Sequence, residues 1–244
     1  MAEMFVARSS ERDGWQALVD PPGEIPSAGR EREIFSSGSF TCGFWEREPD
    51  TWSFERPYDE VSYILEGRAD VELPTGEVLA VSRGTVLVTP KGSKGTWKIH
   101  ERVVKFYAIH SGGEVVEEPA RAIREGDPVA WVALETSPDD PNPPGEEWYA
   151  FRNPSGTFST GVWRRVPETG PMDMSYDEVA ILIEGEVEVE LPGGEMLSAG
   201  PGDVLASPVG SRATWRALSP VRKFWAVHRE AVSREAPPPR ALER

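Results

Sequence analysis

The tripeptide Tyr-Asp-Glu occurs twice in this 244-residue chain, at residues 58–60 and 176–178, and a Thr-Trp pair follows at 96–97 and 214–215. A glutamate buried beside an indole ring is costly to keep charged unless a partner satisfies it. Aromatic walls with a few polar groups suit a small organic ligand. On this basis the candidate ligand-binding residues are Glu60, Trp97, Tyr58, Arg56, Glu178, Trp215 and Tyr176.

Each glutamate also has a candidate lysine partner further along the chain, Lys105 for Glu60 and Lys223 for Glu178. A glutamate with a raised pKa in such a site can act as a general acid or base, so these four residues are the catalytic candidates. The alternative is structural: the lysine neutralises the glutamate and braces two strands, while the tryptophans fill a core. A binding pocket, a catalytic site and a structural pair all fit the residues.

These motifs belong to one long internal repeat. Residues 38–110 align with residues 156–228 at a constant offset of 118 without a gap, and 33 of the 73 paired positions are identical. A repeat of this length is a whole folding unit, because single solenoid repeats are roughly 20–50 residues long. We therefore predict two domains, residues 1–114 and 115–244.

Short β-type segments alternate with turn residues within each copy. In the first copy we expect strands over residues 40–45, 60–65, 69–73, 86–89, 96–99 and 103–110, and a loop over 49–57. Strands and turns at roughly 8–12-residue spacing, without a long helical period, predict an all-β fold of the sandwich or barrel type. If position 95 faces inward, Trp97 and Ile99 do so too, because side chains alternate with a period of two.

Glycine and proline spacings within the repeat carry a family resemblance. The pattern comprises Glu60, Gly67, Gly84, Pro90 and Gly92, and the second copy has Glu178, Gly185, Gly202, Pro208 and Gly210. It resembles the two motifs of the cupin superfamily (RmlC-like), so the chain is identified as a bicupin, two jelly-roll barrels in tandem. Gly-Thr-Trp at 95–97 and the segment from Lys105 resemble the subfamily of the ethanolamine-utilisation cupin, which borders (S)-ureidoglycine aminohydrolase. The resemblance implies metabolism of small amines, amino acids or carboxylates.

The same resemblance implies a metal held by two histidines, a glutamate and a third histidine, but only the glutamates are present. The histidine positions fall on Phe54, Arg56 and Gly95 and on Met172, Met174 and Ala213, or on Ser53, Glu55, Pro171 and Asp173 if the spacing is one residue longer. One carboxylate cannot hold a transition metal tightly, so we expect no metal and no cofactor. An all-oxygen site using Glu55 and Asp59, suited to a hard ion, is the alternative.

Composition excludes several function classes. The net charge of −15 argues against binding nucleic acid or an anionic membrane surface. A single cysteine, Cys42, excludes an intrachain disulfide, and we expect it in the core. The first residues lack the pattern of a signal peptide and no apolar run is long enough to span a bilayer, so we expect a soluble, cytoplasmic protein.

We therefore expect a cupin-domain protein that binds a small molecule without a metal or plays an accessory role in metabolism. A divergent metal-dependent, aminohydrolase-like enzyme and a metal-independent acid/base enzyme using Glu60 are the alternatives. A small-molecule ligand is the expected partner, and a homodimer is possible. The first copy has the larger and more polar residues, such as Trp52 and Arg56 where the second has Gly170 and Met174, so we expect the first barrel to be the working one.

Overall fold

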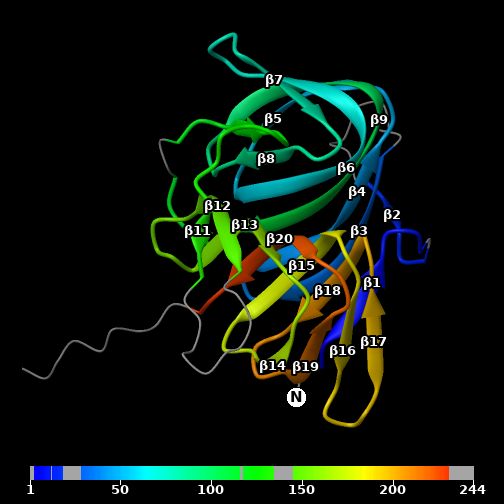
Figure 1. Cartoon of the computed structure of the whole chain (residues 1–244). Coiled ribbons are helices and arrows are strands. Elements are labelled where there is room, and N and C mark those ends of the chain that lie inside the picture. The colour runs from blue at the N-terminus through cyan, green and yellow to red at the C-terminus, as the bar shows by residue number, and fades with distance from the viewer. Residues whose placement is uncertain (1–2, 12, 19–28, 116–117, 135–144, 231–244) are drawn as a thin grey trace, which may run out of the picture.

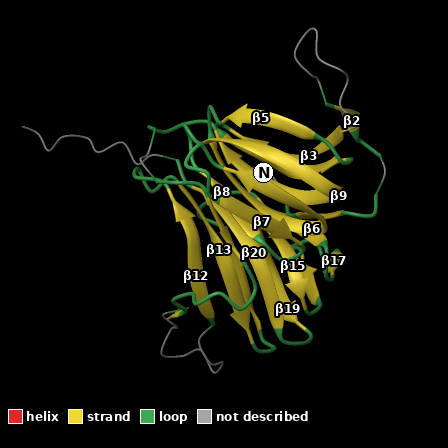
Figure 2. Cartoon of the chain, turned by 90° about the horizontal axis from the view of Figure 1, so that it is seen from above, coloured by secondary structure: helices red, strands yellow, loops and turns green. Residues whose placement is uncertain are grey.

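The computed structural model describes residues 3–11, 13–18, 29–115, 118–134 and 145–230, which form twenty strands and no helix. Figure 1 shows two barrels, one stacked on the other, and Figure 2 shows strands throughout both. The predicted all-β fold is confirmed. Since the described residues contain no helix, none of them forms a helix capable of crossing a membrane.

The first barrel is one nine-stranded sheet that curls around its own interior. Its strands are β2 (Gln16–Ala17), β3 (Gly29–Ser37), β4 (Phe40–Arg47), β5 (Thr51–Glu55), β6 (Asp59–Glu72), β7 (Val78–Ser82), β8 (Val86–Thr89), β9 (Lys94–His110) and β10 (Arg121–Ile123). The two long strands, β6 and β9, pair antiparallel over most of their length.

The second barrel is formed by a seven-stranded sheet and a four-stranded sheet. Its strands are β1 (Phe5–Arg8), β11 (Val132–Ala133), β12 (Glu146–Arg152), β13 (Phe158–Arg165), β14 (Thr169–Asp173), β15 (Asp177–Glu184), β16 (Val187–Glu190), β17 (Met196–Ala199), β18 (Asp203–Ser207), β19 (Arg212–Ala217) and β20 (Val221–His228). In the four-stranded sheet β14 pairs with β19, and in the larger sheet β15 lies between β18 and β20. Tyr176, immediately before β15, packs in the same core as Trp215 of β19.

Three local expectations were wrong, one of them being the separate strands 96–99 and 103–110, which are parts of the single strand β9. Residues 49–57 do not form a loop throughout, since β5 pairs with β9 along Thr51–Glu55. The segments 60–65 and 69–73 are one strand, β6, in which Gly67 adopts a φ of 86° within an irregular stretch of the ladder. A Cβ at Gly67 would lie 2.0 Å from the carbonyl oxygen of Arg102. Glycine therefore marks a bulge here, although in the sequence it resembles a strand end.

Several strands are buried on both faces because each barrel packs against the other. Along β6, Glu60, Ser62 and Ile64 face the interior of the first barrel, while Val61 belongs to a core shared by both barrels. That shared core contains aromatic contacts such as Phe106 with Phe224, whose ring centroids are 6.2 Å apart. The packing accounts for the apolar runs in the sequence.

The two halves also exchange strands. β1, at the start of the chain, pairs with β18 of the second barrel, whereas β10 pairs with β8 of the first barrel. Figure 1 shows β1 beside β17 and β18. Hydrogen bonding therefore crosses the predicted boundary after residue 114 in both directions, and the boundary itself stays a prediction.

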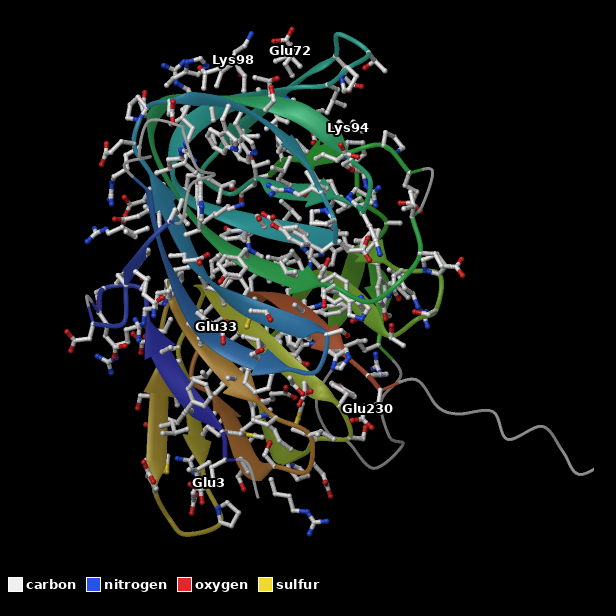
Figure 3. All side chains as sticks on the ribbon, turned by 180° about the vertical axis from the view of Figure 1, so that it is seen from behind. Glu3, Glu33, Glu72, Lys94, Lys98 and Glu230 are labelled. Atoms are coloured by element: carbon white, nitrogen blue, oxygen red, sulfur yellow. The ribbon has the colours of Figure 1, made fainter. Side chains whose placement is uncertain are left out.

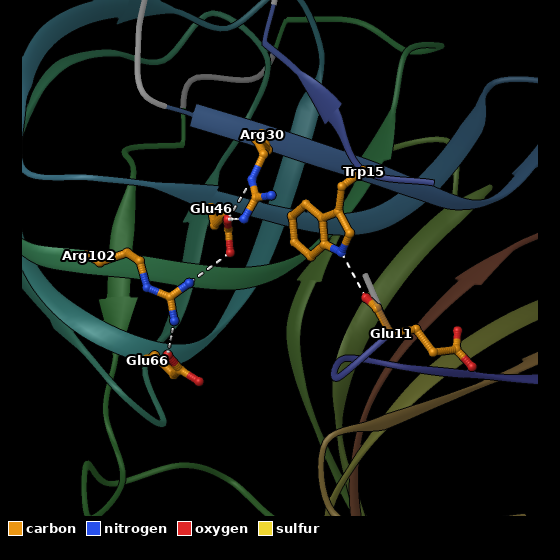
Figure 4. Close-up of polar contacts among 6 residues, drawn as sticks. All are labelled: Glu11, Trp15, Arg30, Glu46, Glu66 and Arg102. Carbon is orange, nitrogen blue, oxygen red and sulfur yellow. Dashed lines mark hydrogen bonds and ion pairs between the residues drawn. The ribbon is translucent and has the colours of Figure 1, made fainter. Parts of the chain in front are cut away.

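Charged side chains cover the outer surface and the ends of strands. Glu72 and Lys98 form an ion pair on the outside of the first barrel, near Lys94 (Figure 3). Glu46 is buried and accepts hydrogen bonds from Arg30 and Arg102, which also reaches Glu66 at 2.7 Å (Figure 4). These pairs account for many of the charges without requiring an acidic binding surface.

The remaining structural expectations concern single residues and the chain end. Cys42 is fully buried, and burial raises the pKa of its thiol well above the ordinary value, so its predicted place in the core is confirmed. The sequence also predicts a proline-rich loop over residues 137–145 and a frayed or extended tail from residue 236. The loop except Gly145, and the whole tail, lie outside the described residues.

Candidate functional site

In the first barrel, Glu60 lies inside and is held by two cations. Its Oε1 is paired with the Nζ of Lys105 and accepts a hydrogen bond of 2.9 Å from the Ser62 hydroxyl, while its Oε2 lies 3.3 Å from a guanidinium nitrogen of Arg56. The side chains of Glu60 and Lys105 are 4% and 5% exposed. The lysine predicted as a partner is therefore in contact with the glutamate, and the arginine is as well.

This environment keeps Glu60 ionised. Burial alone would raise its pKa, but Arg56 and Lys105 outweigh that effect and lower the pKa to about 2. Burial has the largest effect on Lys105 and lowers its pKa despite the neighbouring carboxylate. A carboxylate with a pKa this low is a poor general acid or base near neutrality, so the geometry favours the structural role for the first pair.

Aromatic side chains fill the space above this pair. The Lys105 ammonium lies 4.8 Å from the ring centroid of Trp45 and 5.6 Å from that of Trp97. Trp52 stacks on Trp97 with centroids 5.7 Å apart, and Phe54 packs under the Arg56 guanidinium at 4.7 Å. The bulky residues that led us to expect the first barrel to be the working one thus pack around the Glu60–Lys105 pair.

The second barrel repeats the glutamate–lysine pair but leaves it more open. Lys223 Nζ lies 2.5 Å from Glu178 Oε1, and its ammonium lies 5.0 Å from the Trp163 centroid and 5.6 Å from that of Trp215. The Glu178 side chain is 14% exposed, compared with 4% for Glu60. Within the described part of the chain, Lys223 is the one cation paired with Glu178, and Trp215 has an edge contact with Trp163 at 6.2 Å but no stacked ring.

A cavity of about 760 Å³ opens onto this pair. Its lining includes Glu178, Lys223, Trp163, Trp215, Trp225, Tyr149, Tyr176, Arg229, Gly170 and Met172. The size is within the usual range for sites that bind small organic molecules. The expectation that the first barrel is the working one is therefore not supported by the geometry.

Gly170 accounts for much of the opening. Gly170 lies directly opposite Trp215 across β14 and β19, as Trp52 lies opposite Trp97 across β5 and β9. A Cβ at Gly170 would meet no atom within 4 Å. With glycine in place of tryptophan at this register position, no stacked ring lies opposite Trp215, which lines the cavity.

The aspartate of each Tyr-Asp-Glu motif points away from the site. Asp59 accepts a hydrogen bond of 2.9 Å from the backbone N–H of Lys91, and Asp177 accepts one of 2.8 Å from that of Val209. Adjacent residues of a strand face opposite sides of the sheet, so only the tyrosine and glutamate of the motif approach the interior. The aspartates fix the turn that follows β8 or β18.

Most of the predicted ligand residues gather as expected, but in two unequal sets. Glu178, Trp215 and Tyr176 line the cavity of the second barrel, while Glu60, Trp97, Tyr58 and Arg56 lie in the filled first barrel. The sequence did not identify Trp163, Trp225, Tyr149 and Arg229 as site residues. For Trp163 a signal existed, since it is identical with Trp45 in the repeat, but its inward direction depends on how β13 pairs with β20.

The donors for the metal that the resemblance implies do not fit one. The histidine positions carry arginine, methionine and apolar residues, and no three His, Cys, Asp or Glu side chains are arranged to share an ion within the described ranges. The all-oxygen alternative is not supported either, because the Glu55 side chain points outward, 67% exposed, and pairs with Lys94 at 3.1 Å.

Two jelly-roll barrels in one chain, each with a glutamate on an inner strand, define the bicupin class. The family model described as the EutQ-like cupin domain matches residues 36–107 and 152–225, and the chain belongs to this family. The subfamily resemblance seen in the sequence is thereby confirmed.

Individual relatives are distant. "Acetate kinase EutQ" from Clostridioides difficile (strain 630) is 28% identical over 69 residues, and the match covers 28% of this chain and 43% of that protein, less than half its length. A solved protein of unknown function from Pseudomonas syringae pv. tomato str. DC3000 is 21% identical with a TM-score of 0.71, covering 93% of this chain and 100% of that one. Ylba from E. coli has 11% identity, a TM-score of 0.64 and coverage of 93% and 91%. Both structures share the fold.

Proposed function

We propose that this protein binds a small organic molecule in its second barrel and serves the metabolism of small amines, amino acids or carboxylates. The observation that supports the proposal is the cavity of about 760 Å³, with the Glu178–Lys223 pair in its wall. The family relationship supports only the metabolic field. Side chains of the protein, without a resident metal, make the contacts in this proposal.

The cavity has the composition of a binding site. Trp163, Trp215 and Trp225 provide apolar surface, and the indole N–H groups of Trp215 and Trp225 are buried without a hydrogen-bond partner in the described structure. A buried donor without a partner is costly, and a ligand acceptor would satisfy it. Large aromatic surfaces with few polar groups are typical of small-molecule sites.

A ligand screen tests the proposal. Tryptophan fluorescence of the full-length protein is recorded against a panel of small amines, amino acids and carboxylates, and each hit is retested with Gly170→Trp. The added indole would stack on Trp215 as Trp52 stacks on Trp97, so hits should lose binding. Gly193→Trp makes the same change in an exposed turn, with no atom within 4 Å of the added Cβ, and should retain it.

The two variants also separate specific from nonspecific effects. Binding that survives Gly170→Trp unchanged would place the ligand elsewhere and contradict the proposed site. A folded wild-type protein that responds to nothing in the panel would count against a binding role in this field.

A further inference from the structure

The first barrel contains a guanidinium group and a stacked indole, from Arg56 and Trp52, that the second barrel lacks. In the first barrel one carboxylate is shared by two cations: Lys105 pairs with Oε1 of Glu60, and Arg56 lies 3.3 Å from Oε2. The Arg56 guanidinium also lies 4.7 Å from the Phe54 centroid and 5.8 Å from that of Tyr58. An arginine in this place is stabilised both by charge and by aromatic faces.

In the second barrel the arginine and Phe54 are replaced by methionines, Met174 and Met172, but the neighbouring tyrosine and glutamate remain. Met174 occupies the position of Arg56, while Tyr176 and Glu178 correspond to Tyr58 and Glu60. Lys223 contacts Oε1 of Glu178, and Oε2 has no partner among the described residues. Both Tyr176 and Glu178 line the cavity, so the unpartnered oxygen belongs to a side chain that a ligand can reach.

The second barrel also lacks the aromatic ring that stacks on the inner tryptophan of the first barrel. Trp52 lies nearly parallel to Trp97 in the first barrel, at 3° between the ring planes. At the corresponding register position Gly170 presents no side chain to Trp215, which is 6% exposed and lines the cavity. In the first barrel the corresponding indole, Trp97, is stacked by a planar group, the side chain of Trp52.

We propose that the ligand of the second barrel is an organic cation, an ammonium or guanidinium compound that also carries a planar apolar group. The cation takes the place of the Arg56 guanidinium at Oε2 of Glu178, and the planar group takes the place of the Trp52 indole on Trp215. The inference rests on the proposed function, because it specifies the ligand class of that same cavity.

The charges around the cavity bear on this choice. Lys223 is neutralised by Glu178, and Arg165 pairs with Glu168 at 2.7 Å, so neither adds a free positive charge. Arg229 lies over Tyr176 at 4.3 Å and favours an anion instead. The first barrel shows that one glutamate in this environment accommodates a second cation beside the lysine, and for this reason the cation is preferred.

Three probes of one shape test the ligand class by calorimetry on the full-length protein. They are 2-phenylethylammonium, neutral 2-phenylethanol and anionic 3-phenylpropionate. The cation should bind about tenfold to a hundredfold more tightly than the alcohol, the range expected for a hydrogen bond to a charged group. Glu178→Gln should remove this preference, whereas Glu190→Gln, the same change at an exposed residue of β16, should preserve it.

A second variant protects the test against a folding failure of the first. Met174→Arg introduces the guanidinium that the first barrel has at this position, and it should weaken binding of 2-phenylethylammonium by about tenfold or more because the carboxylate then has an internal partner. Thermal melting curves check that each variant is folded.

The outcomes separate this inference from the proposed function. The alcohol or 3-phenylpropionate could instead bind most tightly, with binding abolished by Gly170→Trp but unaffected by Glu178→Gln. This result would contradict a cationic ligand and would still support a binding pocket in the second barrel. If none of the three probes binds, the proposed cationic ligand class is also contradicted. The metabolite panel then tests separately whether the pocket binds a small molecule.

Discussion

The indole of Trp52 lies on the indole of Trp97 with ring centroids 5.7 Å apart and 3° between the planes. The repeat retains Trp97 as Trp215 but replaces Trp52 by Gly170. The exchange of Trp52 for Gly170, together with that of Arg56 for Met174, therefore distinguishes the filled barrel from the open one. The two copies share one framework and differ in the side chains at these positions.

Trp52→Gly should destabilise the first barrel by about 2–3 kcal/mol. Truncating a fully buried tryptophan costs about 3–5 kcal/mol, and Trp52 is only half-buried. Urea unfolding measures the change. Gly170→Trp, the reverse substitution in the second barrel, should cost far less because the added ring enters open space. A loss below about 0.5 kcal/mol for Trp52→Gly, the scale of neutral surface changes, would contradict the packing role.

Removing Glu60 alone should be more damaging than removing Glu60 and Lys105 together. Glu60→Leu leaves Lys105 and Arg56 without their carboxylate and should cost about 3–5 kcal/mol, whereas adding Lys105→Met should recover the part of the loss that arises from the unpaired lysine. Chemical denaturation of the single and double variants completes the cycle.

Glu55→Leu is the matched control for that cycle, since Glu55 forms an exposed pair with Lys94. It should have little measurable effect because exposed ion pairs contribute little. Additive effects of the two core substitutions would show that Glu60 and Lys105 do not stabilise each other.

Lowering the pH should reduce the free energy of unfolding because Glu60 becomes protonated. Its pKa is about 2 in the folded chain and 4.5 ordinarily, so its stabilising effect is complete above pH 4.5 and is lost as the pH falls towards 2. The contribution is on the order of 3 kcal/mol. Unfolding free energies of wild type and of the Glu60→Leu, Lys105→Met variant, measured between pH 7 and 2, should diverge in that window. Parallel curves would mean that Glu60 has the same pKa folded and unfolded.

The sequence predicted the duplicated fold because the repeat is visible without a structure: Glu60, Gly67 and Pro90 recur at one constant offset. It also predicted the glutamate–lysine contacts, since both residues recur together. It failed where structure depends on distant partners. β5 forms only by pairing with β9, and Pro49 and Pro57 around it favour a loop locally.

Which barrel is the working one stays a prediction, but the sequence does not show how much free space each barrel contains. Large polar and aromatic residues in the first copy indicated a richer site, yet Trp52 and Arg56 occupy the space that a ligand would need. Whether a side chain lines a cavity or fills it depends on the residue opposite. Gly170 facing Trp215 was visible in the alignment, but its consequence required the register of β14 with β19.

Strand exchange leads to a final prediction, that a change near the N-terminus affects the second barrel. Ala7 in β1 is buried and pairs with Val204 in β18. Ala7→Asp places a carboxylate in the core shared by both barrels and should destabilise the protein by about 3 kcal/mol or more. Hydrogen exchange should accelerate at the amides of β18, while those of β8, which pair with β10, should keep their protection.

Arg8→Asp is the control, because Arg8 is exposed on the other face of the same strand and the change should leave β18 protected. The mirror-image variant, Ile123→Asp in β10, should instead expose β8. β18 protection unchanged by Ala7→Asp would show that β1 does not pair with the second barrel in solution. If both variants act as expected, each half depends on a strand from the other, because an unpaired edge at β18 or β8 would otherwise be left open.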